Sequence, residues 1–161
     1  MRLSTKCSIA LHLLVLIKAF EHGKLTSEIL AKSAGCNPVI VRNLLGSLKK
    51  AGMVEVQRGT GGATLTADPA DVTIWDVYRA VDRETLDNLI GLHPNPFPGC
   101  PVGKNIYTLL DKPYRMVSDS VRAAMKSYTL KQLLDEYYAI ESPPEADLQI
   151  LRNCAYDTNI R

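Results

Sequence analysis

The sequence predicts a mainly α-helical protein with one small β-hairpin. Apolar residues recur at helical spacing in several segments, and residue types that cap helices precede most of these segments. Two short segments of alternating polarity flank a glycine-rich tetrapeptide near residue 60, as they do in a β-hairpin. The chain has 161 residues, of which 46% are hydrophobic, so one compact domain with an appended helical arm can form its own core.

The first apolar segment predicts a buried helix over residues 4–21, with Ser4 or Thr5 as its N-cap. Arg2 and Lys6 precede the apolar run Ile9–Ile17, as basic residues do in a secretion signal. However, no small-residue cleavage site follows, and the run is too short to cross a bilayer. We therefore expect a cytoplasmic protein with no membrane partner.

The next two helices predict a helix-turn-helix unit. Thr26 caps a short first helix, and Gly35 occupies the turn, where a residue free to adopt positive φ is needed. Asn37 caps the second helix, which has Pro38 in its first turn and ends near Ala51. The buried stripe expected on this second helix consists of Val41, Leu44, Leu45 and Leu48.

A β-hairpin is predicted directly after this unit. Residues 53–58 and 63–66 alternate in polarity, and Gly59-Thr60-Gly61-Gly62 forms the turn between them. A hairpin in this position is the wing of a winged helix-turn-helix domain, which we assign to residues 1–83.

The rest of the chain is predicted to be helical apart from one loop. Thr73 caps a helix that ends near Asp82, and Thr129 caps the last helix. Pro113 lies inside a long helical segment and should kink or split it. We divide this part into a Pro/Gly-rich candidate effector loop (84–103), a dimerisation helix with a C-terminal helix (104–141), and a tail (142–161).

The two parts of the chain differ in charge. Residues 1–67 contain nine Lys or Arg and three Asp or Glu, which gives a net charge of +6. Residues 68–161 contain ten Lys or Arg and fourteen Asp or Glu, which gives −4 and a total of +2. This asymmetry indicates a first part that binds a polyanion and a second part that serves another role.

The outer face of the second helix of the unit suits double-stranded DNA. Arg42 can donate two hydrogen bonds to guanine and Asn43 suits adenine, while Lys49 and Lys50 can reach phosphates. Arg58 at the wing tip is placed for the minor groove. The expected DNA contacts are Arg2, Lys6, Asn37, Val39, Arg42, Asn43, Lys50, Arg58, Gly59, Thr60 and Gly61. The alternative is a protein-interaction adaptor in which this face is only solvated.

Four motifs resemble the Rrf2-type bacterial transcription regulators over residues 1–140. These motifs are MRLSTK at the start, LKKAGMV at the end of the helix-turn-helix, RGTGG at the wing tip and TIWDVYRAVD further along. The wing tip departs from the family, which often has proline and a following tyrosine where Thr60 and Ala63 stand here.

The resemblance implies a DNA-binding homodimer, which we expect to be a repressor. It implies a partly palindromic operator, and a long helix that crosses its partner after the loop. It also implies that Val39, Arg42 and Asn43 point toward the major groove and that Arg58 enters the minor groove.

Many members of this family hold an iron–sulfur cluster with three closely spaced cysteines in that loop. Here the loop offers Cys100 and, as the other candidate ligand, His93. One thiolate and one imidazole cannot complete a four-coordinate iron site within a subunit. We therefore expect no cluster and no other metal or cofactor, with a cluster shared between subunits as the alternative.

Cys100 is a candidate sensor of oxidants. It lies near the start of the dimerisation helix, where free backbone N–H groups stabilise a thiolate. The alternatives are an inert packing residue, a small-molecule pocket beside the same loop, and a thiol enzyme that uses Cys100 with His93. No orienting carboxylate or nucleotide-binding motif accompanies the pair, so we expect no enzyme activity.

Two further residues have structural interpretations. His12 on the first helix is expected to be a hydrogen-bonded core residue. Trp75 is expected to anchor its helix to the helix-turn-helix rather than to stack on a ligand.

Overall fold

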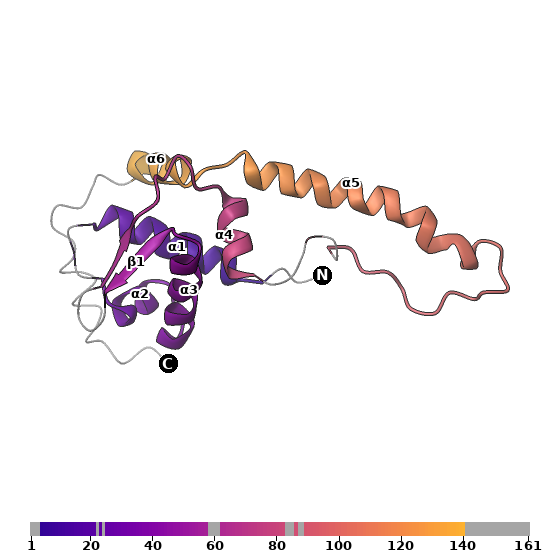
Figure 1. The fold of residues 1–161 in the computed structure, drawn as a ribbon, viewed down its shortest axis with the longest axis horizontal. Helices are drawn as coiled ribbons and strands as arrows, with labels where there is room; N and C mark the ends of the chain where they lie inside the picture. The colour runs from indigo at the N-terminus through magenta and orange to yellow at the C-terminus, as the bar shows by residue number, and fades with distance from the viewer. Residues whose placement is uncertain are drawn as a thin grey trace.

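The computed structural model describes residues 4–21, 23, 25–57, 62–82, 86 and 89–140. Figure 1 shows a globular body from which one long helix and the preceding loop extend as an arm. The fold class is the expected one: mainly helical, with a two-stranded wing. The elements are α1 (Lys6–Ala19), α2 (Ser27–Ser33), α3 (Pro38–Lys50), β1 (Val54–Gln57), β2 (Gly62–Leu65), α4 (Ile74–Val81), the 3-10 turn η3 (Gly103–Asn105), α5 (Ile106–Lys126) and α6 (Leu130–Ile140).

Side-chain caps fix the starts of the helices that position the candidate site. The Thr26 hydroxyl accepts a hydrogen bond from the Ile29 N–H at 3.4 Å, and Asn37 Oδ1 accepts one from the Val39 N–H at 2.8 Å. Thr73 forms a reciprocal capping box with Asp76 at the start of α4. The predicted caps of these three helices are therefore confirmed.

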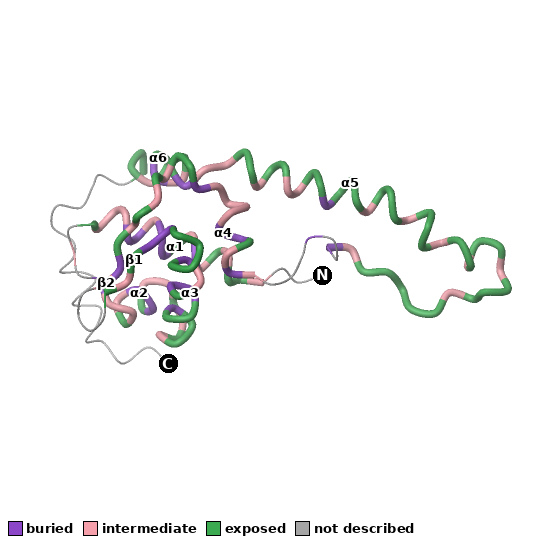
Figure 2. The backbone as a smooth tube through the Cα atoms, viewed as in Figure 1, coloured by how far each residue is buried: buried purple, intermediate pink, exposed green. Residues whose placement is uncertain are grey.

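The core is the contact between α1 and the helix-turn-helix. The predicted α3 stripe is buried, with exposed fractions between 0% and 4%, and it packs with α1 residues such as Leu13 and Leu14. Figure 2 shows this buried zone along α1, α2 and α3. Gly35 adopts the predicted positive φ of 61°, which lets the chain turn between α2 and α3.

α1 differs from the sequence interpretation at one position. His12 is exposed rather than part of the core, and its Nε2 lies 3.0 Å from the Ser33 hydroxyl. The prediction of burial was wrong because His12 lies at the margin of the apolar stripe, where spacing alone does not decide exposure. Within the described parts of the chain, no helix is both long and apolar enough to cross a membrane.

The wing lies against the loop that leads into α2. Its strands are antiparallel, with Val54 opposite Leu65 and Val56 opposite Ala63. Gly62 has a φ of 80°, and a Cβ there would lie 3.0 Å from the backbone nitrogen of Leu25. This close approach needs glycine. The predicted strands are confirmed, whereas residues 58–61 at the tip lie outside the described residues.

The C-terminal half of α5 packs on α4. The Trp75 ring stacks on Tyr78 with centroids 5.7 Å apart, and the Arg122 guanidinium lies 5.4 Å from the Trp75 ring centroid. The buried Ser118 hydroxyl donates to the Leu86 carbonyl at 2.8 Å. Trp75 therefore anchors α4 to α5, and the expectation that it anchors the helix-turn-helix was wrong.

α5 is one continuous helix through Pro113, so the proline does not split it. A proline deprives the carbonyl four residues earlier, that of Leu109, of its usual N–H partner. Leu109 and Pro113 are both exposed, so water can reach this side of the helix. That exposure explains why the helix tolerates the residue.

Candidate nucleic-acid interface

The outer face of α3 is exposed and carries the residues predicted to contact DNA. Val39 is 54% exposed, and Arg42, Asn43 and Lys50 are also exposed. Arg42, Asn43 and Lys50 make no hydrogen bond or ion pair with other described residues. Their donors and charges are therefore available to an external ligand.

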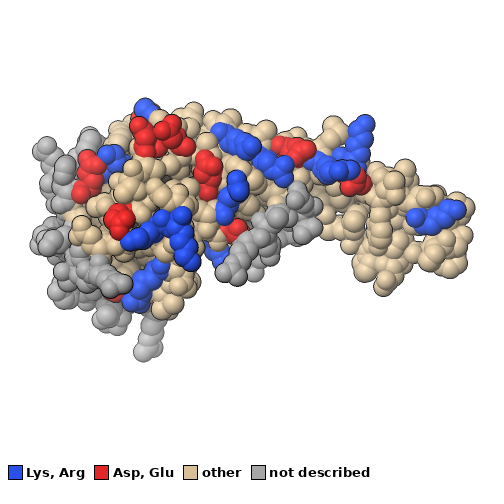
Figure 3. Space-filling view, viewed as in Figure 1, with Lys and Arg blue, Asp and Glu red and all other residues tan. Residues whose placement is uncertain are grey.

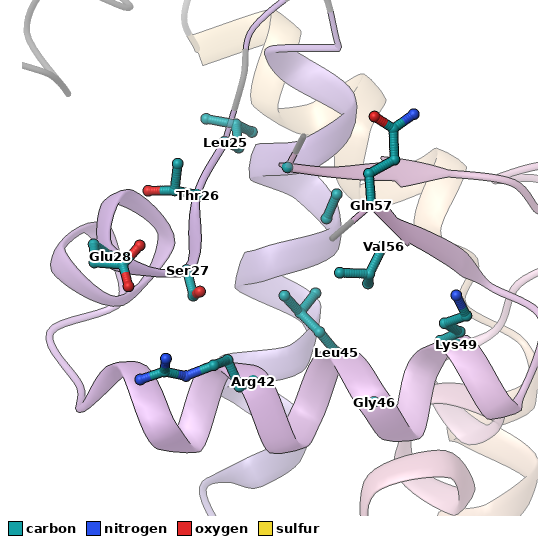
Figure 4. Close-up of a pocket in the computed structure, with 12 residues that line it drawn as sticks. Leu25, Thr26, Ser27, Glu28, Arg42, Leu45, Gly46, Lys49, Val56 and Gln57 are labelled. Carbon is teal, nitrogen blue, oxygen red and sulfur yellow. The ribbon is translucent and has the colours of Figure 1, made fainter. Parts of the chain in front are cut away.

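A groove runs beside this face. It has a volume of about 430 Å³ and lies between α3, the start of α2 and the wing. Figure 4 shows α3 along its base, with Arg42 extending toward α2 and Lys49 toward the strands. Leu25, Leu45 and Val56 supply apolar lining.

Polar residues of the groove include Ser27, Glu28 and Gln57, which sequence reasoning did not single out. Ser27 and Glu28 follow the Thr26 cap, so their position at the start of a helix-turn-helix could have indicated them. Gln57, by contrast, comes next to the α3–α2 surface only through the tertiary packing of the wing.

One predicted phosphate-contacting residue is engaged within the chain. Lys49 Nζ lies 2.5 Å from Glu55 Oε1, so an ion pair joins α3 to β1. Both side chains are about half exposed, at 46% and 54%. The pair links α3 to the wing, and in the last turn of α3 it leaves Lys50 as the cation without an ion pair among the described residues.

The remaining predicted contacts are only partly described. Lys6 is exposed at the start of α1, and Asn37 is exposed although its Oδ1 caps α3. Arg2, Arg58, Gly59, Thr60 and Gly61 lie outside the described residues. Figure 3 shows Lys and Arg side chains gathered on the lower part of the body, where α3 lies.

Cys100 in the loop before α5 has a thiolate-stabilising environment. The pKa of its thiol lies below the ordinary value because the backbone N–H groups of Gly103 and Val102 hydrogen-bond to the sulfur. His93 contacts Tyr107 instead, which donates its hydroxyl to the His93 carbonyl at 2.9 Å. No recorded interaction joins the His93 ring to Cys100 in the described chain.

The other described cysteines lie in the body. Cys7 is half-buried, and burial, reinforced by the Asp82 carboxylate, raises the pKa of its thiol to about 11. Cys36 packs against the main core. Among the described residues, no three His, Cys, Asp or Glu side chains are grouped closely enough to hold a metal ion.

Comparison with protein families matches residues 3–136 to Rrf2, described as an iron-dependent transcriptional regulator. The chain belongs to the Rrf2 family. YwnA of Bacillus subtilis (strain 168), named as an HTH-type transcriptional regulator, is 38% identical over 136 residues, covering 84% of this chain and 99% of YwnA. Membership of a family of DNA-binding transcriptional regulators, not enzymes, agrees with the expectation from the sequence.

Solved structures agree with this family and fold. The crystal structure of a protein named as DNA-binding matches with a TM-score of 0.63 and 35% identity, covering 80% of this chain and 98% of that one. A transcriptional regulator from Lactobacillus plantarum matches with a TM-score of 0.70 and 24% identity, covering 92% and 96%. The second likeness shows the fold alone.

Proposed function

We propose that this Rrf2-family chain is a repressor that binds a partly palindromic operator as a homodimer. The observation that carries the proposal is the outer face of α3. It offers exposed Arg42, Asn43 and Lys50, without a partner among the described residues, beside an open groove. A helix with such a face fits a major groove about 12 Å wide.

Base reading is assigned to Val39, Arg42 and Asn43, which lie in the first half of α3. Lys50, Lys6 and Asn37 are assigned to the phosphate backbone. Arg2, with the wing-tip residues Arg58, Gly59, Thr60 and Gly61, completes the proposed interface, with Arg58 in the minor groove.

The dimer is assigned to α5. Leu109 and Met116 are 60% and 61% exposed and lie on one side of this helix. On the other side, Val121 and Met125 pack on the body. An exposed apolar stripe opposite a packed face suits a second copy of the same helix.

We further propose that the protein functions without an iron–sulfur cluster. The loop supplies Cys100 and His93, and the structure records no contact between their side chains. The described donor groups therefore do not fit the cluster found in other members. The signal is assigned instead to oxidation of the Cys100 thiolate, or to a small molecule bound near the loop.

Operator binding is the test of this proposal. Genomic fragments captured by the protein give the operator, and fluorescence anisotropy then measures affinity against salt. Arg42→Ala should lower discrimination between operator bases by about 1–3 kcal/mol. Lys50→Ala should weaken binding to all DNA sequences alike. It should also reduce the slope of log affinity against log salt concentration by about one.

Lys131→Gln is the matched control, because Lys131 is exposed on α6, at the opposite side of the body from α3. It should leave the operator affinity unchanged. The proposal is refuted if the protein captures no genomic fragment or if its DNA binding does not depend on salt. A stable protein partner that DNA cannot displace would favour the alternative function, a protein-interaction adaptor.

A further inference from the structure

The arm contains a cavity that the DNA-binding interface does not use. Its volume is about 530 Å³, within the range of small-molecule sites. Ile90 and Leu92 line it from the loop, and Tyr107, Leu110 and Tyr114 line it from α5. Two aromatic rings and three aliphatic side chains therefore surround a space large enough for a small organic molecule.

The polar groups of this cavity are one anion and one cation. Asp111 and Arg115 both line it, and they form an ion pair across one turn of α5. Their side chains are 52% and 70% exposed, so a solute can reach both. The recorded bond uses one nitrogen and one oxygen, which leaves the second carboxylate oxygen and further guanidinium N–H groups free.

This composition selects for the charge of a ligand. A simple anion would be attracted by Arg115 but repelled by Asp111. A simple cation would be attracted by Asp111 but repelled by Arg115. A zwitterion satisfies both groups at once, because its ammonium can bind Asp111 while its carboxylate binds Arg115 with two parallel hydrogen bonds.

The cavity is held open by local contacts. The Tyr107 hydroxyl donates to the His93 carbonyl at 2.9 Å and so attaches the loop to α5. The Tyr114 hydroxyl makes no hydrogen bond with other described residues and is available to a ligand. Cys100 does not line the cavity, so the site is separate from the candidate thiol sensor.

The cavity also lies on the side of α5 away from the proposed dimer stripe. Asp111 and Tyr114 are about 140–160° around the helix from Leu109 and Met116, at 100° per residue. Ser118, which is buried against the body, falls on the cavity side. A second α5 on the stripe would therefore leave the site accessible.

We propose that this cavity binds a free α-amino acid with an apolar or aromatic side chain. The ammonium group binds Asp111, the carboxylate binds Arg115, and the side chain lies between the rings of Tyr107 and Tyr114. Binding itself is independent of the proposed function. Only the consequence, that the amino acid acts as an effector of operator binding, rests on it.

Isothermal titration of the full chain tests the site with three probes, L-phenylalanine, L-tyrosine and L-leucine. The matched analogues of phenylalanine are 3-phenylpropanoate, which lacks the ammonium, and phenethylamine, which lacks the carboxylate. At least one amino acid should bind, and each analogue of phenylalanine should bind about tenfold more weakly or worse than phenylalanine itself.

Two variants assign the contacts. Arg115→Gln should weaken phenylalanine binding about tenfold but should not weaken phenethylamine, whose ammonium is no longer repelled by Arg115. Asp111→Asn should weaken phenylalanine binding but not that of 3-phenylpropanoate. Lys112→Gln, an exposed change on the same turn, is the control, and circular dichroism checks that each variant is folded.

The site is refuted if none of the three amino acids binds, or if Arg115→Gln binds phenylalanine as the unchanged protein does. Operator titrations with and without the amino acid test its role as an effector. Amino-acid binding without any DNA binding would reject the proposed function and leave the site intact.

Discussion

At the scale of single residues, the described chain holds two thiols in opposite environments. Backbone N–H groups lower the pKa of Cys100, whereas burial and Asp82 raise that of Cys7 to about 11. A lowered pKa means that the thiolate, which is the reactive form, is already populated at a lower pH. The local contacts therefore make Cys100 the reactive cysteine of this pair.

Alkylation by iodoacetamide, followed by mass spectrometry across a pH series, should show this difference. The Cys100 rate should reach half its maximum below the pH of a free thiol, about 8.5, and the Cys7 rate should stay low until the pH approaches 11. In denaturant both profiles should converge near the free-thiol value. Identical profiles in the folded protein would contradict the assignment.

Gly103→Ala provides a matched variant, because a Cβ at Gly103 would lie 2.5 Å from the Phe97 carbonyl oxygen. The backbone must shift, which weakens the Gly103 N–H bond to the sulfur. The pH at which Cys100 alkylation reaches half its maximal rate should then rise toward the value of a free thiol. The pH dependence of Cys7 alkylation should stay unchanged.

The sequence predicts Cys100 near the start of the dimerisation helix; in the structure it lies three residues before η3 and six before α5. The sequence could not predict that Cys7 is half-buried or that His12 is exposed. Their exposure depends on what the neighbouring elements cover, and periodicity alone does not report that.

At the scale of elements, the attachment of α5 to the body depends on a buried polar contact. Ser118 is 3% exposed, and its hydroxyl donates to the Leu86 carbonyl, 32 residues earlier in the chain. Ser118→Ala leaves this carbonyl without its partner. The free energy of unfolding, measured by urea denaturation, should fall by about 1–3 kcal/mol.

Ser120→Ala is the control for that substitution. The Ser120 hydroxyl also donates to a carbonyl, that of Met116, but within α5 and at an exposed position. Alanine favours helices and water can replace the lost bond, so stability should change little or rise slightly. Equal losses in the two variants would show that burial of Ser118 contributes nothing.

Elements with local signals were the predictable ones. Thr26, Asn37 and Thr73 indicate helix starts through contacts to residues two or three positions away. The Lys49–Glu55 pair and the contacts of Trp75 join different elements, so neither follows from spacing. The groove beside α3 was missed for the same reason, although its Arg42 and Lys49 were recognised.

At the scale of the whole molecule, the arm is the feature that a single chain leaves exposed. Figure 1 shows the N-terminal half of α5 extending beyond the body, and Leu109 and Met116 are about 60% exposed on it. Large apolar side chains exposed on an extended helix are costly in water, and a second copy would cover them. The shape of the chain therefore supports the proposed dimer.

Met116→Asp tests this dimer, because the twofold relation places a charge from each copy in one apolar interface. Light scattering after gel filtration should change from twice the chain mass to the 17.7 kDa of one chain. Thr108→Asp is the control, since Thr108 is exposed on α5 outside the stripe, and it should stay dimeric.

DNA binding then reports whether the dimer matters for function. Two recognition helices held on one molecule make the second half-site contact intramolecular, which can strengthen binding 100-fold or more. Met116→Asp should lose this gain on a full operator but bind an isolated half-site as the unchanged protein does. A monomeric variant that keeps full operator affinity would separate α5 from DNA recognition.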